Sequence, residues 1–136
     1  MPKYLNWISD NLNELLYVRT DIRAKELVAI YFLYNDLDRG DDLLSWIESD
    51  SGDYFYDIKH IFERYEYKEG CAWIEEFLTV VGEIVEGQDL RIKKIMGSVE
   101  IQNKLEALCR VYRKKQPDML LKISELLDLV AQGKTE

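Results

Sequence analysis

Histidine, cysteine, proline and glycine are scarce in this chain, and each scarcity excludes a class of site or scaffold. His60 is the only histidine, and the two cysteines, Cys71 and Cys109, form no CxxC pair. A small secreted domain built on disulfide bonds carries more cysteines at closer spacing. We therefore expect two reduced, unbridged thiols in a cytoplasmic protein. Two prolines and seven glycines also leave little room for linkers or for the turns of a β-sheet protein.

Long apolar runs and phosphate-binding motifs are missing as well. No run approaches the roughly 18 apolar residues that span a membrane, and the start, MPKYLNWISDNLNELL, mixes polar with apolar residues, unlike a signal peptide. Neither a GxGxxG nor a GxxxxGK motif occurs. His60 lies near Asp57 and Glu63, but a metal ion there needs further ligands from elsewhere. We expect no enzyme, no catalytic, cofactor-binding or metal-binding residue, no cofactor and no membrane contact.

The composition that remains is typical of one globular domain. The chain has 136 residues, 47% of them hydrophobic and 32% charged, which is enough to bury a core. Apolar residues recur at helical spacing, and no segment alternates with period two for long enough to form a strand. We predict a single all-α domain over residues 1–136, a bundle of seven or eight helices.

Capping residues and glycines divide this bundle into its helices. Residues 27–34 are apolar nearly all round, so the helix that contains them is expected to be the most buried. The run Ser49 to Asp53 predicts a loop, and Gly87 is expected to end the helix before it in a left-handed conformation. The helices are predicted at about 3–17, 24–37, 43–48, from the loop to about 67, 71–86, 89–96, 99–115 and from 117 onward. The expected caps are Thr20 or Asp21 for the second helix, Asp41 or Asp42 for the third, and Ser98 for the seventh.

Charge is distributed unevenly along the chain. Residues 36–87 carry fifteen acids and four bases, whereas residues 88–122 carry four acids and nine bases. Within the stretch from Asp36 to Asp57, eight carboxylates accompany a single base, Arg39. A net charge of −8 argues against direct binding to nucleic acid or to an anionic membrane, since both need clustered cations.

Two interpretations of the acidic stretch stay open. Its carboxylates can form a solvated surface that caps helices, or they can bind a basic partner. Four aromatic residues between the acids, which a merely solubilising surface does not need, favour the binding surface. The predicted partner-binding residues are Asp36, Asp38, Asp41, Asp42, Trp46, Glu48, Asp50, Asp53, Tyr54, Tyr56 and Asp57. The basic runs at 91–94 and 110–115 are expected to be exposed and to pair with the protein's own acids.

Residues 40–78 contain an aromatic pair at Trp46 with Ile47, a Ser51-Gly52-Asp53 loop, and a Gly70-Cys71-Ala72 junction between two predicted helices. In these motifs they resemble the core of a family of small, acidic, all-helical DNA-mimic proteins. The family's paired glycines fall here on Asp41 and Asp42, and its asparagine falls on Gly40, so the turn before the short helix departs from the pattern. The resemblance implies mimicry of DNA phosphates and inhibition of a DNA-binding protein.

The favoured function is a non-catalytic inhibitor, a monomer or homodimer whose carboxylates occlude the basic site of a partner. A DNA mimic and an immunity protein against a nuclease toxin fit equally well, because both use the same physics. The alternative is a helical adaptor module that binds a peptide or a partner helix in an apolar groove, with its charge incidental. Binding should weaken steeply with salt in the first case only.

Overall fold

The structure is a computed structural model that describes residues 2–135, with side chains described as far as Gln132. Within that range it contains eight α-helices, two short helical turns and no strand, which confirms the predicted all-α fold. The elements are α1 (Leu5–Asp10), the π-helical turn η1 (Glu14–Val18), α2 (Ile22–Asp38), α3 (Leu43–Glu48), the 3-10 turn η2 (Asp50–Tyr54), α4 (Phe55–Arg64), α5 (Lys68–Val81), α6 (Gln88–Ile95), α7 (Val99–Arg113) and α8 (Gln116–Thr135).

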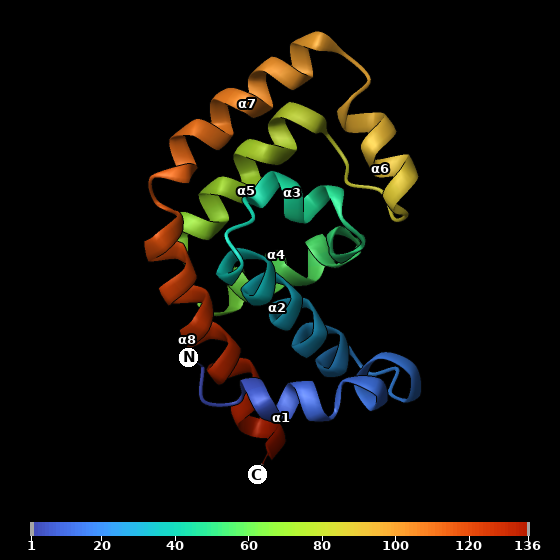
Figure 1. Cartoon of the computed structure of the whole chain (residues 1–136), viewed down its shortest axis with the longest axis vertical. Helices are drawn as coiled ribbons and strands as arrows, with labels where there is room; N and C mark the ends of the chain where they lie inside the picture. Colours follow the sequence, from blue (N-terminus) through green and yellow to red (C-terminus); the bar gives the residue numbers. More distant parts are fainter. Residues whose placement is uncertain (1, 136) are drawn as a thin grey trace.

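Helix α2 lies at the centre of the molecule, with α8, α4 and α1 packed against it (Figure 1). It begins where the carboxylate of Asp21 accepts a hydrogen bond from the backbone N–H of Ala24 at 3.3 Å. Its residues from Leu27 to Ile30 are all buried, as their uninterrupted apolar character predicts. Because this turn of α2 is buried on every side, the helices that pack against it are positioned by their contacts with α2.

Helices α5 and α7 form an antiparallel pair to one side of α2 (Figure 1). The Nζ atom of Lys115, just after α7, lies 3.9 Å from a carboxylate oxygen of Glu69 in the first turn of α5. Ser98 caps α7 by accepting a hydrogen bond from the N–H of Ile101 at 3.0 Å, as the sequence predicts. The link between the two helices contains α6, which lies near α3 and η2.

An aromatic cluster joins α3, α4 and α5 beneath the acidic stretch. The ring centroids of Trp46 and Phe55 are 6.2 Å apart, and those of Trp73 and Phe77 are 5.4 Å apart. Phe55 also contacts both Trp73 and Phe77. All four side chains are almost completely buried. Because these rings pack tightly at the core, they fix the position of α3 and of the residues that follow it.

Several predicted boundaries were wrong. Helix α4 ends at Arg64 rather than near residue 67, and α5 begins at Lys68 rather than at residue 71. The first helix ends at Asp10, where the Asn11 side chain donates a hydrogen bond back to the Trp7 carbonyl. Residues 50–54 form a 3-10 turn rather than an open loop. Helix α5 ends at Gly82, whose φ of +80° only glycine adopts readily, and not at Gly87. Residues 83–86 remain outside any helix.

Candidate functional site

The predicted acidic residues do not share one surface. Asp36 is buried at the end of α2, with one carboxylate oxygen 2.5 Å from Arg39, and Asp41 binds the same guanidinium at 3.1 Å. Burial raises the pKa of Asp36 despite this cation. Asp38, at the end of α2, is exposed. Asp36 therefore stabilises the turn after α2 and has almost no surface to offer a partner.

Asp42, which precedes α3, and Glu48, its last residue, both lie near α7. Asp42 accepts a hydrogen bond from the N–H of Ser45 at 2.8 Å and so caps α3, and its carboxylate is 3.7 Å from Arg113. Burial raises the pKa of Glu48, and the charge of Asp42 raises it further. A substitution at Asp42 thus changes helix stability as well as surface charge.

The aromatic residues of the stretch divide between core and surface. Trp46 and Phe55 are 1% and 0% exposed, so neither reaches a partner in this conformation. Tyr54 is half-buried against Phe32, with the ring centroids 5.8 Å apart. Tyr56 is exposed, and its hydroxyl accepts a hydrogen bond from the N–H of Ile84 at 3.1 Å. Of the predicted contact residues, Trp46 and Asp36 are therefore left out of the candidate site.

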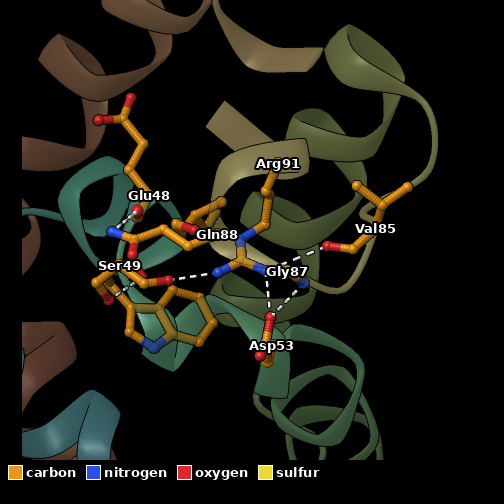
Figure 2. Close-up of polar contacts among 9 residues, drawn as sticks. Glu48, Ser49, Asp53, Val85, Gly87, Gln88 and Arg91 are labelled. Atoms are coloured by element: carbon orange, nitrogen blue, oxygen red, sulfur yellow. Dashed lines mark hydrogen bonds and ion pairs between the residues drawn. The ribbon is translucent and has the colours of Figure 1, made fainter. Parts of the chain in front are cut away.

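A buried arginine fixes the segment between α3 and η2. The Arg91 guanidinium, on α6, is 1% exposed (Figure 2). It donates to the carbonyl oxygens of Ile47 at 2.6 Å, of Val85 at 3.1 Å and of Ser49, and it forms an ion pair with Asp53 at 2.5 Å. The sequence predicts that Arg91 pairs with the protein's own acids, and it does. The prediction that this basic run is exposed is wrong for Arg91.

Gly52 is the residue that makes room for this guanidinium. A Cβ atom at that position would lie 2.2 Å from the Ile47 carbonyl oxygen and 2.6 Å from Nε of Arg91. Contacts this short force the backbone or the arginine to move. Position 52 therefore requires glycine, because no side chain fits there. The run SDSGD indicated only that this glycine lies in a turn.

The segment before α6 closes over the same residues. Its Gly87 N–H donates to the carboxylate of Asp53 at 2.9 Å, and the Gln88 side chain donates to the Glu48 carbonyl at 3.0 Å (Figure 2). Burial alone would raise the pKa of Asp53, but the Gly87 N–H and the Arg91 guanidinium together lower it. Two segments about 35 residues apart in sequence are joined here by charge-assisted hydrogen bonds.

These contacts bring further carboxylates next to the predicted ones. Glu86 and Asp89 are exposed on the closing segment. Glu86 is close enough to Asp57 to raise its pKa, although burial is the larger cause and Lys25 opposes both. We call this surface the acidic corner and define it by its six carboxylates, which come from α3, η2, α4 and the segment around the start of α6: Glu48, Asp50, Asp53, Asp57, Glu86 and Asp89.

The acidic corner has an uncompensated outer charge. In the described part of the chain, Asp50, Glu86 and Asp89 have no ion pair, and the one guanidinium inside the corner is buried. Sequence reasoning missed Glu86 and Asp89, and it did not predict that Arg91 is buried. Both acids follow the stretch it selected, and only the fold brings their segment to Asp53. The run EGQD at 86–89 was the available signal, because it places a glycine between acids.

No protein-family model, no curated protein and no solved structure matches this chain. The resemblance of residues 40–78 to DNA-mimic proteins therefore stays a prediction. The acidic corner has to be interpreted from its own geometry.

No three potential ligand side chains among the described residues gather closely enough to hold a metal ion, and His60 is exposed. The structure shows Cys71 and Cys109 as free thiols, which confirms that they are not bridged. Burial raises the pKa of Cys109 to about 11, so this thiol is a poor nucleophile at neutral pH. In the described range, no helix has the length and apolar character to cross a membrane.

Proposed function

We propose that this protein is a non-catalytic inhibitor that binds the basic, nucleic-acid-binding surface of another protein through the acidic corner. The observation that carries the proposal is that one buried arginine joins the end of α3, η2 and the segment before α6, which bear most of the acids of the corner. A solvated, merely solubilising surface needs no such fixed arrangement. A DNA-binding protein and a nuclease toxin are both partners of this chemistry.

The physical basis is pre-organisation combined with electrostatic attraction. The hydrogen bonds of Arg91 and Asp53 fix the backbone that carries Glu48, Asp50 and Glu86, so less conformational entropy is lost on binding. Carboxylates on the corner take the place of phosphates opposite lysine and arginine side chains. Their shared charge accelerates encounter with a basic partner at low ionic strength. Tyr54 and Tyr56 provide aromatic contact area beside them.

A matched pair of charge reversals tests this proposal. The first variant carries Asp50→Lys and Glu86→Lys, both exposed residues of the corner. The control carries Asp10→Lys and Glu125→Lys, which are exposed on α1 and α8 and change the net charge equally. Asp128 is unsuitable as a control, because it accepts hydrogen bonds from the backbone N–H groups of Lys3 and Tyr4.

The immobilised proteins are used to capture basic proteins from a cell extract, and the captured nucleic-acid-binding protein is then purified. Unlabelled wild-type protein should displace fluorescent duplex DNA from it, the control should do so equally well, and the corner variant should not. The proposal fails if saturating wild-type protein leaves the DNA bound. It also fails if both variants lose activity equally, because net charge alone then decides binding.

One observation favours the alternative function of a helical adaptor. A largely apolar groove of about 520 Å³ lies between α5 and α7. A groove between two helices is a common docking site for a third, amphipathic helix. Binding at this groove should depend little on ionic strength, which separates it from binding at the acidic corner.

A further inference from the structure

The groove between α5 and α7 is lined by apolar side chains that the fold leaves uncovered. Val111 is 56% exposed, Ala107 is also exposed, and Val80 and Leu108 are half-buried. On α7 the groove residues are Lys104, Ala107, Leu108 and Val111, at the three- and four-residue spacing of one helix face. This face of α7 therefore has the pattern of a helix that packs against another helix.

The charges at the edges of the groove differ between its two sides. The α5 side carries Glu75 and Glu76, and the α7 side carries Lys104. Glu76 lies beside the last turn of α7, because its carboxylate adds to burial in raising the pKa of Tyr112. Lys104 belongs to the first half of α7. Glu75 and Glu76 thus lie near the C-terminal end of α7, whereas Lys104 lies closer to its N-terminal end.

We propose that the occupant of this groove is α7 of a second copy of this chain, in a two-fold dimer in which the two α7 helices run antiparallel. A two-fold axis near Ala107 brings Lys104 of each copy over Val111 and next to Glu75 and Glu76 of the other. The small side chain of Ala107 allows the helices to approach closely at the crossing. The exposed face of α7 in each copy then lies in the groove of the other copy. Both copies thus use the same surface, as a two-fold interface requires.

The charge pattern along α7 favours this antiparallel orientation. Glu100 lies in its first turn, and Lys114, at the same helical spacing as Lys104, Ala107 and Val111, directly follows its last turn. An antiparallel pair places acids of one copy near bases of the other, whereas a parallel pair opposes like charges. Because α7 has 15 residues, the contact is about 22 Å long. An interface of that length is small, so the dimer is expected to dissociate at low concentration.

Sedimentation velocity over a wide range of protein concentration tests the dimer. The wild-type protein should pass from monomer to dimer as its concentration rises. Ala107→Glu and Val111→Glu, both at exposed positions, should abolish the dimer without a change in the helical circular dichroism signal. A wild-type protein that stays monomeric at the highest concentration overturns the proposal. It does so even if an added amphipathic peptide binds in the groove.

A charge swap tests the orientation independently. Lys104→Glu and Glu75→Lys alone should each weaken dimerisation about fivefold or more, because each creates two like-charge contacts. The double variant should restore dimerisation toward the wild-type value, and the Asp10→Lys, Glu125→Lys protein serves as the control. A dimer that is indifferent to the single changes, or that the double change does not restore, contradicts the antiparallel arrangement. DNA displacement by the acidic corner is a separate readout, so the two proposals fail independently.

Discussion

Arg91 is the residue on which the acidic corner depends most. It replaces its water shell with three backbone carbonyl oxygens and one carboxylate, and its planar guanidinium serves all four acceptors at once. A buried cation with fewer partners would destabilise the fold. The sequence shows a basic run at 91–94 but not which of its members turns inward, because burial depends on acceptors contributed from α3 and η2.

Substitution of Arg91 by Lys should lower the free energy of unfolding by about 3 kcal/mol, because an ammonium group cannot reach every acceptor and leaves buried carbonyls unpaired. Urea denaturation followed by circular dichroism measures the change. Lys93→Ala, an exposed position on the same helix, is the control and should stay within about 0.5 kcal/mol of wild type. Equal effects at the two positions would show that the buried hydrogen bonds of Arg91 do not stabilise the fold.

Glu48 and Asp57 should titrate above their ordinary ranges, because burial raises both pKa values. Their protonation favours the folded state, so this stabilisation is complete below the unfolded-state pKa of about 4 and is lost as the pH rises through the raised values. The charge of the corner consequently decreases as the pH falls through these raised pKa values, and partner binding should weaken. Carbon-13 titration of the side-chain carboxyl groups checks this, and ordinary pKa values at both residues would contradict it.

At the scale of elements, the sequence predicted most of the fold because local signals were strong. Asp21, Asp42 and Ser98 cap the helices that they were expected to begin, and residues 26–30 of α2 are all buried. The failures occur where two signals compete. Ile84 continues the apolar spacing of α5, so Gly82 was passed over as its end. The structure buries Ile84 from a non-helical segment instead, with its N–H on the Tyr56 hydroxyl.

The cap of α7 provides a direct test at this scale. Ser98→Ala removes the acceptor of the Ile101 N–H and should lower the free energy of unfolding by about 1 kcal/mol. Ser98→Asp supplies another acceptor and should recover most of that loss. The thermal midpoints of the three proteins provide the comparison. A loss that Asp does not recover would mean that Ser98 acts through packing rather than as a cap.

At the scale of the whole molecule, the fold turns an uneven sequence of charges into an uneven surface. The sequence identified the acidic stretch, but it could not separate acids that stabilise helices from acids that face outward. Asp36 and Asp42 belong to the first kind, and Asp50 belongs to the second. Glu86 joins the surface only because Gly87 bonds Asp53 across the chain. Contacts between residues so far apart in the sequence depend on how the helices pack, and a local sequence pattern does not predict them.

The most direct test of the acidic corner is the salt dependence of association with the captured basic protein. Association rates of wild-type protein, of the Asp50→Lys, Glu86→Lys variant and of the Asp10→Lys, Glu125→Lys control are measured by stopped flow from about 50 to 500 mM salt, a range that crosses the regime of strong screening. We predict a steep fall for wild type and control, and a slower rate with a much shallower fall for the corner variant. The same slope for all three proteins would contradict a binding site at the acidic corner.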